Sequence, residues 1–212
     1  MRRRVLMCVL AAVWPATAMA QTTPHGYVQA IGGIATTSAT DAVLAGGVAV
    51  RATDRLDVFG ELGHLRNGIW TALEDDLDAT GQQISAQIAA MFGAGAPVTF
   101  EARVPVWYGL GGVRAHGPQF GRLATYGEAA IGFARLRPEV RLEVGGERLD
   151  AEAGRLLTFE EERSELMSAL GAGIAFRLFG PVRIEAGYRY SRIYGDRPVN
   201  VNRVHAGVGY AF

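Results

Sequence analysis

Residues 203–212, RVHAGVGYAF, alternate between two kinds of side chain. Every second position is apolar: Val204, Ala206, Val208, Tyr210 and Phe212. The positions between them hold Arg203, His205 and residues with small side chains. Successive side chains of a β-strand point to opposite faces of a sheet, so this period of two predicts a strand with one apolar face and one small or polar face.

Earlier parts of the chain repeat this period. The further segments that show it are 26–36, 42–51, 56–62, 103–110, 125–133, 165–178 and 182–191. Eight antiparallel strands are therefore expected, and most have about the length that a tilted strand needs to cross a bilayer. In the segment 103–110, the alternation places Trp107 on the inner face and Val106, Tyr108 and Leu110 on the outer face.

The faces opposite the apolar ones carry glycine and both signs of charge. Their charged residues are Asp57, Glu61, Arg103, Glu128, Arg177, Arg183, Glu185, Arg189 and Arg203. A small membrane barrel has this arrangement, because its outside meets lipid and its lumen is filled by side chains. Lipid cannot satisfy backbone hydrogen bonds, so the sheet must close. We predict an all-β fold, an eight-stranded antiparallel transmembrane β-barrel, whose inward charges pair with one another.

Two other interpretations of the same pattern remain open at this point. A lipocalin-like or sandwich protein in solution would have the same alternation with its apolar face turned inward. Within a membrane barrel, the inward charges could line a gated or leaky pore instead of plugging the lumen. Unpaired buried charges are costly, by ~3–5 kcal/mol, which favours the plugged lumen.

The connections between the predicted strands differ in length. The short ones are 52–54, 116–122 and 179–181, the long ones are 66–102 and 137–165, the segment 193–200 is intermediate, and 37–41 is shorter than expected. Short turns on one side and long loops on the other are typical of outer-membrane barrels, in which the long loops lie outside the cell. An even number of strands would place both ends of the barrel in the periplasm.

Residues 1–20 have the form of a secretory signal peptide. Arg2, Arg3 and Arg4 precede an apolar run at 5–14, and Ala18-Met19-Ala20 matches a cleavage site before Gln21. The apolar run is too short to span a bilayer. We therefore expect residues 21–212 to form the barrel domain, and this domain contains no cysteine because Cys8 lies in the signal.

Composition excludes several classes of protein. The chain has 21 basic and 21 acidic residues and is 49% hydrophobic, which argues against intrinsic disorder. All basic residues are arginine, and removal of residues 1–20 leaves 18 of them against 21 acids. Without a basic excess to neutralise phosphates, a nucleic-acid partner is not expected.

The chain resembles the eight-stranded outer-membrane β-barrel proteins of Gram-negative bacteria, which include the OmpA transmembrane domain and the OmpX-like and OmpW-like proteins. The resemblance lies in the signal peptide, Gly26-Tyr27-Val28, Gly46-Gly47 and the closing segment 207–212. It implies a location in the outer membrane, in contact with lipid and lipopolysaccharide. It also implies that Val208, Tyr210 and Phe212 form the signal recognised by the barrel-assembly machinery. We expect a monomer.

Catalytic and metal sites have little support. None of His25, His64, His116 and His205 has a partner at metal-binding spacing, so no metal or other cofactor is expected. Barrel enzymes that deacylate lipid A carry a histidine and a serine two residues apart on one strand. Gly207 and Arg66 occupy the corresponding positions here. No catalytic residue is predicted, because no nucleophile has an adjacent base.

The connection 66–102 contains a helix signal. Thr80 and Gln83 have the spacing of a capping box, and Gly93 would end the helix. Its apolar face would consist of Ile84, Ile88, Met91 and Phe92. This short extracellular helix would pack on the barrel rim, or act as a lid or partner-binding surface.

Together these features predict a non-enzymatic scaffold with a plugged lumen that interacts with its surroundings through its loops. The alternative is a narrow OmpW-like channel for small or apolar solutes. A lipid-modifying barrel enzyme is a third hypothesis with less support.

Overall fold

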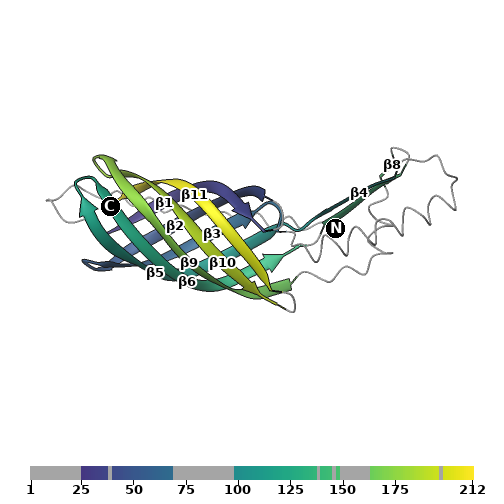
Figure 1. Cartoon of the computed structure of the whole chain (residues 1–212), viewed down its shortest axis with the longest axis horizontal. Coiled ribbons are helices and arrows are strands. Elements are labelled where there is room, and N and C mark those ends of the chain that lie inside the picture. The colour runs from purple at the N-terminus through teal and green to yellow at the C-terminus, as the bar shows by residue number, and fades with distance from the viewer. Residues whose placement is uncertain are drawn as a thin grey trace, which may run out of the picture.

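The computed structural model describes residues 25–37, 40–68, 98–137, 139–144, 147–148, 163–195 and 198–212. Eight of its strands form a closed antiparallel barrel in the order β1-β11-β10-β9-β6-β5-β3-β2 (Figure 1). Their bounds are β1 Gly26–Thr36, β2 Thr40–Thr53, β3 Leu56–Leu65, β5 Val106–Phe120, β6 Leu123–Leu136, β9 Arg163–Phe179, β10 Val182–Tyr194 and β11 Val199–Ala211. The predicted eight-stranded barrel is confirmed.

The two ends of the barrel differ in their connections. At one end, two-residue turns join β2 to β3, β5 to β6 and β9 to β10. Gly121 and Gly180 in these turns have φ of 64° and 52°, which is unstrained only for glycine. The first and last strands also meet here, since the His25 amide donates to the Phe212 carbonyl oxygen at 2.7 Å. We call this the short-turn end and the opposite one the long-loop end.

A second sheet lies at the long-loop end and was not predicted. It consists of β4 Val98–Arg103, β7 Glu139–Val144 and β8 Glu147–Arg148. Because β4 precedes β5 and β7 follows β6, the β4–β7 pair lies beyond the barrel along the same two chain segments (Figure 1). Arg103 is therefore outside the lumen, contrary to the prediction. The segment 103–110 is interrupted at Pro105, which has no amide to donate to a ladder.

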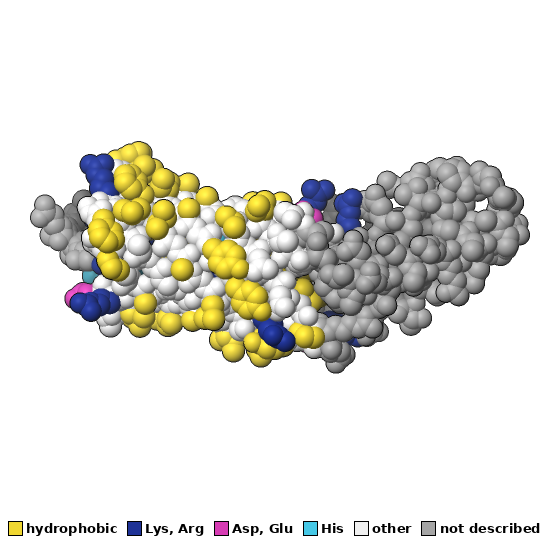
Figure 2. All heavy atoms as spheres, viewed as in Figure 1, with side chains coloured by type: hydrophobic (Ala, Val, Ile, Leu, Met, Phe, Trp, Pro, Cys, Tyr) yellow, Lys and Arg dark blue, Asp and Glu magenta, His cyan; other side chains and the backbone are white. Residues whose placement is uncertain are grey.

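The apolar faces of the strands point outward, as predicted. Val204 is 57% exposed, and Ile184 and Val208 are exposed beside it on β10 and β11. Figure 2 shows hydrophobic side chains over the visible face of the barrel and arginines near its ends. The soluble interpretation, with these residues inside, does not fit this arrangement.

The prediction of which side chains of β5 point into the lumen was wrong. Trp107 is 55% exposed on the outside, whereas Val106, Tyr108 and Leu110 are buried in the lumen. The prediction assigned the more apolar face to the lipid. That rule fails where the lumen itself is apolar, as it is near the start of β5.

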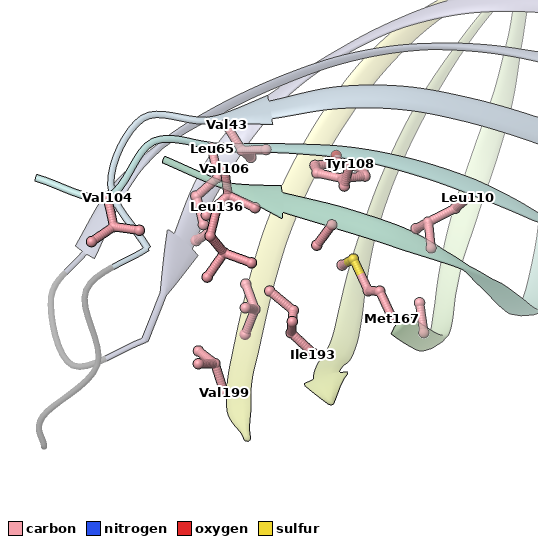
Figure 3. Close-up of a cluster of buried hydrophobic side chains, with 14 residues drawn as sticks. Val43, Leu65, Val104, Val106, Tyr108, Leu110, Leu136, Met167, Ile193 and Val199 are labelled. Carbon is pink, nitrogen blue, oxygen red and sulfur yellow. The ribbon is translucent and has the colours of Figure 1, made fainter. Parts of the chain in front are cut away.

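Apolar side chains fill the lumen at the long-loop end, and we call them the apolar plug. Figure 3 shows its labelled members directed toward one another from several strands. The plug consists of Ala35, Val43, Leu65, Val104, Val106, Tyr108, Leu110, Ala134, Leu136, Met167, Ala169, Ile193, Val199 and Val201. The Val104 amide donates to Asn67 Oδ1 at 3.1 Å, which ties the start of β5 to the segment after β3.

All regular elements of the described residues are strands. Within those residues, no helix has the length and hydrophobicity needed to span a membrane. The predicted helix with Ile84, Ile88, Met91 and Phe92 lies outside the described residues, and so does the predicted signal peptide.

Replacing Val204 by arginine tests the outward face. A cationic side chain facing lipid near the middle of the barrel should destabilise it by about 2–4 kcal/mol, while Phe120→Arg beside the short turn should cost about 0–1 kcal/mol. Urea unfolding of the protein in phospholipid vesicles measures both. If both substitutions changed the free energy of unfolding by less than about 0.5 kcal/mol, as on a water-exposed surface, Val204 would not face lipid.

The position of Trp107 can be tested by fluorescence. In the chain without residues 1–20 that carries Trp70→Phe, Trp107 is the one tryptophan left. Because its side chain is exposed on the outside of β5, lipids brominated on their acyl chains should quench its emission. If the brominated lipids did not quench the emission, the indole would lie in the lumen.

Candidate functional site

The inward positions of five strands carry the most strongly buried charges of the described residues. Six of these side chains and the partly exposed Arg183 form a series of alternating charge that we call the charge ladder. In order of contact they are Arg203, Glu61, Arg189, Glu128, Arg114, Glu185 and Arg183. The strands β3, β5, β6, β10 and β11 supply them, so the ladder crosses the lumen from wall to wall.

Glu61 is the second member of the ladder and is shared by two arginines. Arg203 Nη1 donates to Glu61 Oε1 at 2.8 Å, and Arg189 Nη1 donates to the same oxygen at 2.7 Å. The Tyr108 hydroxyl donates to this oxygen as well, at 3.0 Å. Arg189 and Arg203 are directly opposite each other on β10 and β11, a like-charge pairing that is normally unfavourable. Glu61 from the far side of the lumen offsets it.

Glu128 and Arg114 form the middle of the ladder. Glu128 Oε1 accepts from Arg189 Nε at 2.7 Å, and its other oxygen accepts from Arg114 Nη2 at 2.8 Å. Arg114 Nη1 donates to Glu185 Oε2 at 2.9 Å and to the Tyr27 hydroxyl at 2.8 Å. Arg183 completes the ladder through Nη2, 3.1 Å from Glu185 Oε2.

Each buried carboxylate of the ladder has two arginine partners, and this pairing offsets the cost of burying its charge. Arg114 is 0% exposed, and a buried charge that lacks a partner is strongly destabilising. Each glutamate contacts two arginines, so the ladder carries one more positive than negative charge. Aromatic faces help to hold this excess, since the Arg114 guanidinium carbon lies 4.1 Å from the Tyr126 ring centroid.

Glycine makes room for these large side chains. A Cβ on Gly63 would lie 2.2 Å from the Tyr108 hydroxyl oxygen, and one on Gly171 would lie 2.8 Å from Glu128 Oε1. Any side chain at these positions would displace the residue that it faces. The glycine-rich inner faces are therefore a packing requirement of the ladder.

A smaller polar group lies at the short-turn end. His116 Nε2 is 2.8 Å from Asp57 Oδ2, and Arg51 Nε is 3.8 Å from Asp57 Oδ1. Arg177 is exposed at the same end, and no ion pair within the described ranges includes it.

Six of the nine charges that the sequence placed in the lumen belong to the charge ladder, and a seventh, Asp57, lies with Arg51 and His116 at the short-turn end. Asp57, Glu61, Glu128, Arg183, Glu185, Arg189 and Arg203 all point inward and form ion pairs. Arg103 lies on β4, and Arg177 at the barrel mouth. The sequence analysis missed Arg114, because the predicted segment ended at Leu110. Its signal was the continued alternation of Gly112, Arg114 and His116.

His205 is a further ionisable group of the lumen wall. It is buried, and neither ring nitrogen has a hydrogen-bond partner among the described atoms. Gly207 follows it on the inner face of β11, where a barrel deacylase would have serine. Among the residues that the structure describes, no three His, Cys, Asp or Glu side chains are grouped closely enough to hold a metal ion.

The C-terminal strand presents its predicted assembly residues on the outside. Val208 and Tyr210 are exposed on the outer face of β11, and Phe212, which follows the strand, is exposed as well. The strand itself pairs with β10 on one side and β1 on the other, so it completes the barrel.

Comparison with known proteins agrees with this architecture. A family model described as the outer membrane protein beta-barrel domain matches residues 6–212. No curated protein matches the chain. The solved structure of Neisserial surface protein A (NspA) is similar, with 15% identity, a TM-score of 0.56, and coverage of 89% of this chain and 97% of that one. The likeness shows a shared fold.

Two further solved structures have lower TM-scores. Ail, the attachment invasion locus protein of Yersinia pestis, has 16% identity and a TM-score of 0.49, with coverage of 90% of this chain and 100% of that one. The N-terminal β-barrel domain of Pseudomonas aeruginosa OprF has 12% identity and a TM-score of 0.45, with the same coverage.

Glu128→Gln tests the charge ladder. The substitution leaves two buried arginines with a weaker acceptor, so the free energy of unfolding should fall by about 3–5 kcal/mol. Asp54→Asn, the same change at an exposed turn residue, should alter it by less than about 0.5 kcal/mol. Urea unfolding in vesicles gives both values, and a loss at Glu128 no larger than that at Asp54 would show that the ladder contributes little.

Proposed function

Because the chain belongs to the outer membrane protein beta-barrel domain family, we propose that it is a closed, non-enzymatic scaffold of the outer membrane that presents its long connections to the outside of the cell. The observation that carries this proposal is the filling of the lumen by two successive layers. The charge ladder occupies the part toward the short-turn end, and the apolar plug occupies the part toward the long-loop end.

The two layers block different permeants. An ion that entered from the short-turn end would have to displace arginines and glutamates that already hold one another. A hydrated solute that entered from the long-loop end would have to lose its water among the side chains of the apolar plug. The cavity that remains between the layers, lined by Leu110, Met167 and Arg189 among others, has a volume of about 20 Å³. This is room for about one water molecule.

The alternative is a narrow channel for small or apolar solutes. The apolar lining of the long-loop half supports this hypothesis, because such a lining would suit an apolar solute better than an ion. The channel would require Met167, Leu110 and their neighbours to move apart, because the space between them holds no more than a water molecule.

Partners follow from the same proposal. The exposed apolar face would contact outer-membrane lipid and lipopolysaccharide, and the barrel would act as a monomer. Val208, Tyr210 and Phe212 would be the segment that the barrel-assembly machinery recognises. No nucleic-acid partner is proposed.

Among the residues that the structure describes, His205 is the candidate for an enzymatic role, because its buried ring has no hydrogen-bond partner there. The next residue on the inner face of β11 is Gly207. The His205 side chain is buried on the lumen side of the barrel wall. Lipid A that differs in mass between cells with the wild-type chain and cells with His205→Ala would favour an enzyme over the scaffold.

Conductance in a planar lipid bilayer tests the closed lumen. The reconstituted protein should give no stable, discrete openings under conditions in which a reference porin conducts, because two layers of side chains lie in series. Arg189→Ala alone should also stay closed, since it leaves the apolar plug in place. Discrete openings of the wild-type protein would contradict the scaffold proposal and favour the channel.

A further inference from the structure

The mouth of the barrel at the short-turn end contains a basic cavity that the closed scaffold does not use. Its volume is about 80 Å³. A cavity needs only ~10–15 Å³ to hold one water molecule. This cavity therefore has room for a small tetrahedral anion together with some of its water. The cationic side chains that line it are Arg51, Arg122, Arg177 and Arg183. We call it the arginine mouth.

Negative charge balances only two of these four arginines. Among the described residues, no carboxylate lines the arginine mouth. Asp57 lies 3.8 Å from Arg51 and 2.8 Å from His116, and Glu185 is shared by Arg114 and Arg183. Among the ion pairs of the described residues, none includes Arg122 or Arg177. Arg183 is also the fourth arginine of the charge ladder, which has three glutamates, so it shares its carboxylate partner with Arg114.

The pairing of strands concentrates this positive charge. Arg177 on β9 and Arg183 on β10 are directly opposite each other, next to a register shift in the ladder. Like charges at opposing positions destabilise a sheet. Glu61 offsets the corresponding pair, Arg189 and Arg203, deeper in the lumen. Glu185 pairs with Arg183 at 3.1 Å, but no ion pair among the described residues includes Arg177, so no carboxylate there bridges the two arginines.

The turn between β5 and β6 brings a third guanidinium to this pair. The Arg177 amide donates to the Arg122 carbonyl oxygen at 3.0 Å, and Arg122 Nη1 donates to the Leu178 carbonyl oxygen at 3.3 Å. These backbone contacts fix the turn against β9, so that Arg122 and Arg177 line the same cavity. Guanidinium groups bind phosphate through paired N–H donors, which a chloride ion cannot match.

We propose that the arginine mouth binds a phosphate group, held by Arg122, Arg177 and Arg183, at the end of the barrel that carries the short turns. The phosphate takes the place that Glu61 has in the deeper pair and relieves the repulsion between Arg177 and Arg183. The source of the group is either a soluble phosphate compound or the head group of a phospholipid. The inward positions of Arg51, His116 and Arg183 favour the soluble source, because they face the barrel axis.

Titration calorimetry with inorganic phosphate tests the site. The protein is kept in maltoside micelles, which carry no phosphate, and sodium chloride keeps the ionic strength constant. The wild-type chain should give a saturable heat below ~10 mM phosphate, and Arg122→Gln with Arg177→Gln should weaken binding at least about ten-fold. Neither residue belongs to the charge ladder, so the lumen stays closed in this variant.

Arg192→Gln is the matched control, because Arg192 is an exposed arginine of β10 near the long-loop end. It should bind phosphate as the wild-type chain does. Without phosphate, the double variant should melt no lower than the wild-type chain, because it relieves repulsion. A phosphate-dependent rise in melting temperature should occur in the wild-type chain and in Arg192→Gln only.

A second arm uses the same micelles with added phosphatidylglycerol and no free phosphate. Stabilisation that depends on Arg122 and Arg177 in this arm, but not with inorganic phosphate, identifies a lipid head group as the source. The reverse result identifies a soluble compound. Absence of binding by the wild-type chain in both arms, or equal binding by the double variant, overturns the proposal and leaves the closed scaffold unaffected.

Discussion

The narrow lumen of an eight-stranded barrel has to be filled by side chains, and the rest of this structure depends on how that requirement is met. A charge that points into such a space can neither reach water nor move away, so it needs a partner from another strand. Glu61 meets this need for Arg189 and Arg203, whose strands would otherwise place two positive charges opposite each other. The glycines of the inner faces then provide the space that these long side chains occupy.

The lumen is not uniform along its axis. Its ion pairs are gathered in the part nearer the short turns, and its aliphatic side chains in the part nearer the long connections. This division explains why assigning the more apolar face to the lipid was correct for most strands and wrong for β5. Where the lumen is charged, the more apolar face of a strand is the outer one. Where the lumen is apolar, both faces are apolar, and Trp107 could not be assigned to the outside from its neighbours in the sequence.

Features that depend on local sequence were predictable, and features that depend on distant pairing were not. The period of two and the short connections are visible within about ten residues, and they sufficed for the barrel and for seven of the inward charges. The partner of Glu61 is Arg203, 142 positions later, and no local pattern specifies it. The sheet of β4, β7 and β8 was missed for a related reason, because β4 pairs with a strand that lies beyond both β5 and β6.

The pairing of β1 with β11 has a consequence for the way the molecule forms. These are the first and last strands of the barrel, so their contact closes the longest loop in the fold, and the entropy lost in closing a loop grows with its length. All other neighbouring strands in the barrel could pair as hairpins or larger loops while the chain was still incomplete. Until β11 arrives, the nascent sheet would keep two unpaired edges, each able to recruit a strand from another molecule. Because closure has the largest loop-entropy cost, we expect it to be the slowest step of biogenesis, and a catalyst that shields both edges would act where β1 meets β11.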